Sequence, residues 1–239
     1  MFKPLTGALR AFTTTGAAVA ADLASAATYA VETVGDAVTG RRSGGAVLRV
    51  RVLILSDESG RPLCSPDDVL GSVRAAQRIF DAGAGTRVRL TEVTTITEPA
   101  PTPALDPRAN RGLLLDDITG RLDFFRDHLE PSLIASPVTV VVVRDISGRA
   151  TGCSLGMTAD WVVCQAALFD AARPDTYDET VLAHELGHAL NLPHHRDRAN
   201  LMFPESSPPD RRRGTGLAAW QSMVLRTNRH TVHLPSGVA

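Results

Sequence analysis

Three histidines and one glutamate are gathered within the eleven residues HELGHALNLPH, at positions 184–194. His184 and His188 are four residues apart, and on a helix that spacing places two imidazoles on one face, directed at one point. Two imidazoles placed in this way can supply two ligands to a zinc ion. Glu185 follows the first histidine and is close enough to reach a metal-bound water without being a ligand. We therefore predict a helical zinc site that carries its own general base.

The third nitrogen ligand expected of a catalytic zinc site is His194, six residues after His188. An unbroken helix would place His194 about 1.7 turns beyond His188, so the chain must turn back between them. Asn191 and Pro193 suit that turn, because Asn tolerates the left-handed conformation that ends helices and Pro disfavours helix at the residue before it. A chance HExxHxxxxxH is expected only ~2 × 10⁻⁴ times in a chain of this composition, which favours a metal site over ordinary helix histidines.

This stretch resembles the extended signature of the metzincin zinc peptidases, HExxHxxGxxH, with Asn191 in place of the usual glycine to give HExxHxxNxxH. A second motif, NLMFP, places Met202 eight residues after His194. It is similar to the Met-turn of the metzincins and, together with Asp197, most resembles the matrixins, which carry LMYP. The resemblance implies that Met202 forms an apolar floor beneath the zinc ligands and is not itself a ligand.

The residues and the resemblance together predict a zinc-dependent endopeptidase, with Zn²⁺ as its cofactor and a protein or peptide as its substrate. Zinc held by three neutral histidines lowers the pKa of its water toward ~7 and polarises a carbonyl group. Glu185 would accept the proton of that water and return it to the leaving amine. Peptide bonds would then be hydrolysed through a Glu-activated zinc-bound water.

Substrate recognition is expected along an edge strand before the zinc helix, as the resemblance implies, where an extended peptide adds as a further strand. This role falls on residues 151–157, in which Gly152 and Gly156 would let a peptide backbone approach closely. Simple loop flexibility is an equal alternative for both glycines. The pocket beyond the scissile bond is expected to be walled by residues after the Met-turn, from Phe203 toward Trp220.

Two other functions are compatible with the same residues. One is a zinc-bound binding module of metzincin fold without proteolytic activity, which a fourth protein ligand such as His195 or Asp197 would favour. The other is a zinc hydrolase that acts on a non-peptide amide. Glu185 favours an enzyme, because a structural zinc site needs no adjacent base. The remaining histidines show no ligand spacing and are expected at the surface; they are His128, His230 and His233.

The elements that must position the site follow from the hydrophobic pattern. The predicted fold class is α/β (α+β) and metzincin-like: a twisted mixed sheet, two long helices before the zinc helix, and a small irregular C-terminal subdomain with the Met-turn and a closing helix. Apolar runs and alternation predict strands at 47–55, 86–96 and 137–143, then an irregular edge strand and a short buried strand within 146–165. Helical spacing predicts helices at 65–83, 113–130 and 217–226.

The first of these helices has the clearest limits. Ser65 is a suitable N-cap, Pro66 suits the first helical position, and Gly83 is expected to end the helix. The proline-rich stretch 98–107 is expected to form neither a helix nor a strand ladder.

Composition limits the partners. The chain has 239 residues, of which 44% are hydrophobic and 21% charged, with a formal net charge of -1, so we predict a globular protein. No run approaches the roughly 18 apolar residues of a membrane-spanning helix, and the near-neutral charge offers no general attraction to nucleic acid. The basic run at 211–213 stands without interleaved aromatic residues and is expected to be a solvated loop.

Residues 1–45 are rich in Ala, Thr and Gly, and we expect them to be an appendage to a metallopeptidase catalytic domain at 46–232. Lys3 and Arg10 precede the weakly apolar run AFTTTGAAVA, which fits a signal peptide and predicts secretion. A pro-segment or a mildly amphipathic helix on a cytoplasmic protein is the alternative.

The three cysteines do not decide the compartment. Cys64, Cys153 and Cys164 permit at most one internal bridge, and none of them forms a CxxC pair. Buried thiols, or a single bridge between Cys153 and Cys164, are the expected states.

Overall fold

The computed structural model describes residues 45–107, 124, 136–146, 152–154, 161–206 and 210–233, with the backbone alone for 152–154. Several predictions fall outside these residues: the N-terminal segment, Gly156, His128 and the second long helix at 113–130, of which only Phe124 is described and is helical.

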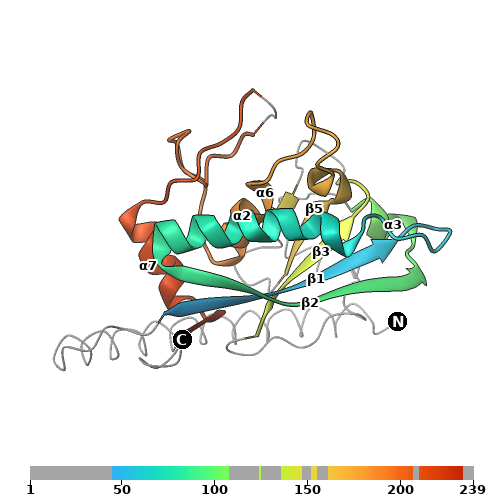
Figure 1. Ribbon diagram of the computed structural model, residues 1–239, viewed down its shortest axis with the longest axis horizontal. Coiled ribbons are helices and arrows are strands. Elements are labelled where there is room, and N and C mark those ends of the chain that lie inside the picture. The colour runs from blue at the N-terminus through green and yellow to red at the C-terminus, as the bar shows by residue number, and fades with distance from the viewer. Residues whose placement is uncertain are drawn as a thin grey trace, which may run out of the picture.

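Within the described residues, a six-stranded mixed sheet forms the centre of the fold (Figure 1). Its strands are β1 (Ala46–Ser56), β2 (Thr86–Pro99), β3 (Val138–Val143), β4 (Gly152–Ser154), β5 (Trp161–Gln165) and β6 (Thr231–His233). The order across the sheet is β2-β1-β3-β5-β4, and β6 pairs with the start of β1. The strands β2, β1, β3 and β5 are parallel, whereas β4 and β6 are antiparallel to their partners. The expected mixed sheet is present, and β4 is its short edge strand beside the buried β5.

The central strands have the sequence of a sheet that is covered on both faces. Every residue of VTVVVV in β3 is buried, and alternate side chains enter two separate cores. Val140 and Val142 belong to the core shared with α2 and α6, while Val141 and Val143 lie in a second core on the opposite face. Strands buried on both faces are continuously apolar, which is why β3 could be predicted from the sequence.

The helix α2 (Pro66–Ala84) lies along the sheet beside β1 and β2 (Figure 1). It starts with a capping box: the Asp68 N–H donates to the Ser65 hydroxyl at 3.3 Å, and the Ser65 N–H donates to the Asp68 carboxylate at 2.8 Å. The predicted N-cap and the proline in the first turn are confirmed.

The predicted end of α2 at Gly83 is wrong. The helix continues to Ala84, and Gly85 caps it in the left-handed conformation with φ 59°. Gly83 has a different role, because a Cβ at this position would lie 2.8 Å from Leu217 Cδ1. The absence of a side chain at Gly83 therefore lets the segment before the closing helix pack directly on α2.

The prediction that 98–107 forms no regular structure is also wrong. β2 extends to Pro99, opposite Ser56, and a single helical turn, α3 (Thr102–Leu105), follows. Proline is tolerated in both places, because an edge strand and the first turn of a helix each have positions that need no N–H donor. α3 contributes Ala104 and Leu105 to the second core.

The C-terminal part of the chain contains further helices and returns to the sheet through β6. After a 3-10 helix (Ala166–Phe169) come α6 (Val181–Ala189) and α7 (Ala219–Thr227), which is the closing helix predicted at 217–226. None of the helices within the described residues is both long and apolar enough to cross a membrane.

Two histidines that were expected at the surface are structural. His230 is fully buried with Nδ1 2.9 Å from the Ser136 carbonyl oxygen, and half-buried His233 has Nε2 2.8 Å from the Arg226 carbonyl oxygen. The prediction is wrong for both, because the chain after α7 folds back to form β6 against β1, and each ring then hydrogen-bonds to a backbone carbonyl, before β3 for His230 and in α7 for His233.

Candidate metal centre

The helix α6 holds the first part of the site inside the fold. Every residue of α6 except His188 is buried, since the helix contacts α2 on one side and β4 and β5 on the other. Its start is fixed by Asp178, whose Oδ1 accepts hydrogen bonds from the Thr180 N–H at 2.9 Å and the Thr180 hydroxyl at 2.7 Å. His184 and Glu185 are only 3% and 4% exposed. Both groups are therefore largely removed from bulk water.

Hydrogen bonds to the backbone determine which ring nitrogen each helix histidine offers. His184 Nδ1 lies 2.8 Å from the Leu201 carbonyl oxygen, and His188 Nδ1 lies 2.8 Å from the Leu192 carbonyl oxygen. A carbonyl oxygen can only accept, so each Nδ1 carries the proton and each Nε2 presents a lone pair when the ring is neutral. The two Nε2 atoms are 3.1 Å apart. A cation between the two Nε2 atoms would remove the repulsion between these lone pairs.

The turn that was expected between His188 and His194 is present. α6 ends in a Schellman motif, in which the Leu192 N–H donates to the Gly187 carbonyl at 2.9 Å and the Asn191 N–H donates to the His188 carbonyl at 3.0 Å. Asn191 has φ 68° and is the one non-glycine residue of positive φ among those described. The prediction of a left-handed Asn191 is therefore confirmed.

The turn brings His194 back to the helix histidines. One ring nitrogen from each of the three histidines lies within 4.8 Å of those of the other two. The ring centroid of His194 is 5.5 Å from that of His184 and 4.6 Å from that of His188. Within the described part of the chain, this group contains no fourth His, Cys, Asp or Glu.

These donors fit zinc. Zn–N bonds of about 2.0–2.1 Å in a tetrahedron place two nitrogens about 3.3 Å apart, close to the separation of the two Nε2 atoms. Burial, with a smaller effect from nearby Arg213, lowers the pKa of His184 to about 2. Burial also lowers the pKa of His188 to about 4 and, in direction, that of His194. All three rings are consequently neutral at pH 7, which is the protonation state that a metal ligand needs.

Met202 packs against α6 at Gly187, the residue before His188. It is fully buried, and a Cβ on Gly187 would lie 2.5 Å from its sulfur and 3.6 Å from Leu192 Cδ1. The absence of a side chain at Gly187 therefore leaves space for the Met202 side chain against α6. This role of Gly187 was not predicted, because it depends on a contact with a residue fifteen positions later.

Buried amide groups hold the segment that contains Met202, and sequence reasoning missed them. The Asn200 Nδ2 donates to Gln221 Oε1 at 2.7 Å, and the Gln221 Nε2 donates to Asn200 Oδ1 at 3.2 Å. The same Asn200 oxygen accepts from the Met202 N–H at 2.9 Å. This reciprocal pair joins the Met202 segment to α7, and the only sequence sign was a polar residue immediately before the apolar pair LM.

Glu185 is a buried carboxyl group with unused hydrogen-bonding capacity. Its Oε2 has no hydrogen-bond partner among the described residues. Burial raises the pKa of Glu185 to about 8, and the positive charge of Arg213 partly opposes this rise. A carboxyl group that can hold or release a proton near neutral pH beside three histidines is suited to acid–base chemistry.

Arg213 contradicts the prediction that 211–213 is a solvated loop. Arg211 and Arg212 are exposed, but Arg213 is only 6% exposed and its Nη2 lies 3.9 Å from Asp178 Oδ2. The prediction fails here because Gly214 follows: a Cβ on Gly214 would lie 2.0 Å from the Ala199 carbonyl oxygen. That close approach draws the end of the basic run into the protein.

The remaining predicted positions are only partly described. Gly152 begins β4, at the edge of the sheet and in contact with α6, which is the arrangement that strand addition by a peptide requires. Its role, and that of Gly156, remain predictions. The backbone N–H of Asp197 donates to His195 Nδ1 at 3.1 Å, and the Asp197 carboxylate accepts from the Ala199 N–H at 2.9 Å.

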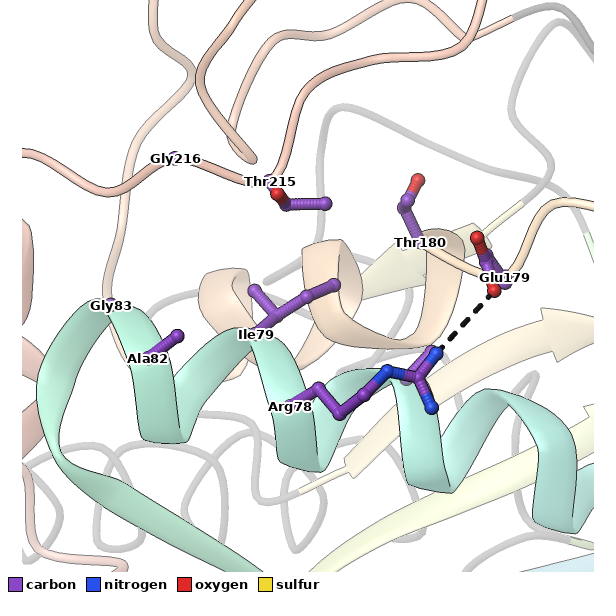
Figure 2. A pocket seen from close by; sticks show the side chains of 9 residues that line it. Arg78, Ile79, Ala82, Gly83, Glu179, Thr180, Thr215 and Gly216 are labelled. Carbon is purple, nitrogen blue, oxygen red and sulfur yellow. Dashed lines mark ion pairs between the residues drawn. The ribbon is translucent and has the colours of Figure 1, made fainter.

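A surface hollow of about 430 Å³ lies away from the histidines, between α2 and the segment at 215–216 (Figure 2). Figure 2 shows Ile79 and Thr180 directed into it and the ion pair of Arg78 with Glu179, 3.6 Å, at its edge. None of the three clustered histidines, nor Glu185, lines this hollow. We therefore assign the chemistry to the histidine group and not to the hollow.

No protein-family model and no curated protein sequence matches the chain. Among solved structures, the chain is similar to metalloproteinase-II from Bacteroides fragilis, with 13% identity, a TM-score of 0.44, and coverage of 75% of this chain and 52% of that one. It is also similar to a zinc-dependent peptidase from Methanocorpusculum labreanum (strain Z), with 14% identity, a TM-score of 0.40, and coverage of 74% and 99%. A third similar structure is a chaperone-substrate complex, with 13% identity, a TM-score of 0.45, and coverage of 78% and 38%.

This chain thus spans about half the length of the Bacteroides fragilis metalloproteinase and 99% of the Methanocorpusculum labreanum peptidase. With identities of 13–14%, these likenesses are too distant to assign an activity to this chain. An activity is therefore inferred from the geometry and burial of the three histidines and Glu185.

Proposed function

We propose that this protein is a zinc-dependent endopeptidase of metzincin type, similar to the matrixins. The observation that carries the proposal is the arrangement of His184, His188 and His194, whose ring nitrogens meet within 4.8 Å. Glu185 follows the first of them in the sequence, and the packing of Met202 against Gly187 of the same helix supports its proposed part as the floor of the site. Three protein ligands with an open fourth position are typical of catalytic zinc sites, whereas structural sites have four.

Each of these residues has a distinct part in the proposed reaction. The three histidines hold the metal through nitrogens whose orientation is fixed, for His184 and His188, by hydrogen bonds to backbone carbonyls. When bound, zinc supplies Lewis-acid polarisation of the substrate carbonyl and acidifies water. Glu185 accepts the proton of the attacking water and transfers it to the amine that leaves.

Burial of Glu185 supports this assignment. A carboxyl group with a raised pKa binds a proton more strongly than a free glutamate, and the same group must later donate that proton to a leaving amine. The Glu185 oxygen without a partner is available to water or substrate. A peptide bound along β4 would bring its scissile bond past α6, since β4 contacts this helix.

The test is hydrolysis of internally quenched peptides by the full chain and by the variant Glu185→Ala. We expect the wild type to cleave an internal peptide bond and the variant to lose about 10²–10⁴-fold in kcat/KM while it retains zinc, because this is the typical contribution of a general base. Glu92→Ala is the matched control, since Glu92 is exposed on β2, at the other end of the strand order from β4. Equal turnover by wild type and Glu185→Ala would refute the mechanism, and zinc binding without cleavage by the wild type would indicate a binding module.

A further inference from the structure

Asn200 and Gln221 are joined by two hydrogen bonds in the interior of the protein, where they are 5% and 0% exposed. The oxygen of each amide also accepts from a backbone N–H, that of Met202 at 2.9 Å for Asn200 and that of Ala218 at 2.8 Å for Gln221. Each side chain therefore donates and accepts at once, which an ionised carboxylate could not do. The pair is a specific arrangement of two amides rather than a general polar contact.

The peptide unit between Leu201 and Met202 connects this pair to the candidate metal centre. The Leu201 carbonyl and the Met202 N–H belong to one planar unit, and in the trans form they point in opposite directions. Asn200 Oδ1 accepts from the N–H, while the carbonyl oxygen lies 2.8 Å from His184 Nδ1. The hydrogen bond on one side of the unit thus restrains the carbonyl on the other side.

Other backbone hydrogen bonds of this segment act on neighbouring peptide units. The Leu201 N–H donates to the Gly216 carbonyl at 2.8 Å, and the Met202 carbonyl accepts from the His195 N–H at 2.8 Å. Neither bond involves the unit that contacts His184. Among the described residues, the side-chain bond to that unit comes from Asn200, which Gln221 in turn holds from α7.

We propose that Asn200 and Gln221 are positioning residues of the metal centre. They hold the Leu201–Met202 peptide unit so that its carbonyl keeps the proton of His184 on Nδ1 and leaves Nε2 for the metal. The inference rests on the proposed function and adds the closing helix α7 to the elements that determine zinc affinity. Groups that orient a metal ligand typically change metal affinity 10–100-fold when they are lost.

His188 is an internal reference for this proposal. Its Nδ1 lies 2.8 Å from the Leu192 carbonyl, which belongs to the turn at the end of α6 and not to the segment at 200–202. Loss of the amide pair should therefore change the ring of His184 and leave the ring of His188 as it is. A general loosening of the fold would change both.

The first test is nitrogen-15 NMR of the two rings in the zinc-free full chain at pH 7. The variant is Gln221→Met, which keeps an unbranched side chain of similar length without the amide. In the wild type we expect both rings to carry the proton on Nδ1. In the variant we expect the His184 Nδ1 proton to exchange with water about 10-fold faster, the change that corresponds to loss of an ordinary hydrogen bond, and the His188 proton to be unaffected. An unchanged His184, or equal changes at both rings, would overturn the inference.

If Gln221→Met does not fold, Gln221→Glu takes its place. A carboxylate still accepts from Asn200 Nδ2 and from the Ala218 N–H, but it cannot donate to Asn200 Oδ1. We expect faster proton exchange at His184 alone in this variant as well. The same exchange rate as in the wild type would count against the proposal.

Zinc affinity is the second measurement, with Ser222→Ala as the matched control. Ser222 follows Gln221 on α7, and its hydroxyl donates to the Gly83 carbonyl at 2.6 Å, so this variant weakens the attachment of α7 to α2 without removing a group that contacts Asn200. We expect the zinc Kd to rise about 10-fold in Gln221→Met and to stay unchanged in Ser222→Ala. An equal rise in both variants would show that the amide pair has only a structural role.

The two measurements separate this inference from the proposed function. If the wild type binds no zinc or cleaves no peptide, the proposed function fails, and the NMR comparison of His184 with His188 in the zinc-free chain still decides the inference. If the wild type cleaves peptides but Gln221→Met alters neither the His184 ring nor the zinc Kd, the inference fails and the proposed function stands.

Discussion

At the scale of single residues, the site consists of polar groups that are buried in the folded protein but do not make all of their hydrogen bonds to other protein groups. The Nε2 atoms of His184 and His188 face each other at 3.1 Å, and Glu185 Oε2 has no partner among the described residues. Burial of such groups is unfavourable in itself. A cation between the two Nε2 atoms and a water or substrate molecule at Glu185 Oε2 would supply the missing partners.

The buried state of Glu185 predicts a pH dependence of stability in the zinc-free protein. Its pKa is raised from 4.5 to about 8, first by burial, so the folded state binds the proton more tightly than the unfolded chain. The stabilising contribution is therefore complete below about pH 4.5 and is lost as pH rises through 8. The slope that this one proton contributes is at most about 1.4 kcal/mol per pH unit.

The measurement is urea unfolding of chelator-treated wild type and Glu185→Gln between pH 5 and 9. The lowered pKa values of the histidines act in the opposite direction, since protonation of the unfolded chain below about pH 6.5 destabilises the fold, but this effect is common to both proteins and cancels. We expect wild type to lose stability relative to Glu185→Gln as the pH rises. If the free energies of unfolding of wild type and Glu185→Gln differed by the same amount at every pH, the raised pKa of the buried Glu185 would be contradicted.

At the scale of elements, the end of α6 decides whether the third histidine reaches the site. Asn191 at φ 68° turns the chain, and the Leu192 carbonyl after it accepts from His188 Nδ1. This turn could be predicted, because an Asn and a Pro lie between ligands whose spacing no single helix can satisfy. The end of α2 could not be predicted, because Gly83 and Gly85 are both residues at which a helix can end. Gly83 is instead required by the packing of Leu217 against it, and Gly85 caps the helix.

Substitution of Asn191 tests the turn. Asn191→Gly keeps the left-handed conformation, and we expect its zinc Kd to stay within about 3-fold of wild type. Asn191→Val places a β-branched residue where the left-handed conformation costs at least about 1–2 kcal/mol, so we expect about 10-fold weaker zinc binding as His194 is displaced. Competition with a chromogenic chelator measures both constants. Equal affinity of the Val and Gly variants would show that His194 does not depend on this turn.

At the scale of the whole molecule, the site is assembled from segments that only the complete fold brings together. Arg213 meets Asp178 across 35 residues, and β6 returns from the end of the chain to pair with β1 at its start. The sequence pattern predicted the strands β1 to β5, the first helix and the clustering of the three histidines, because each depends on local periodicity, but it did not predict β6. It missed the burial of Arg213 and His230, since nothing near either residue shows which distant segment will cover it.

The most direct test of the central claim is the zinc environment of the purified full chain. Metal analysis should give one zinc per chain, and X-ray absorption at the zinc edge should show three histidine nitrogens at about 2.0–2.1 Å with one further light atom. His188→Ala should lose the metal, whereas His195→Ala should keep it with the same spectrum. A folded wild type without zinc, or a spectrum that changes in His195→Ala, would contradict a centre built from His184, His188 and His194 with an open fourth position.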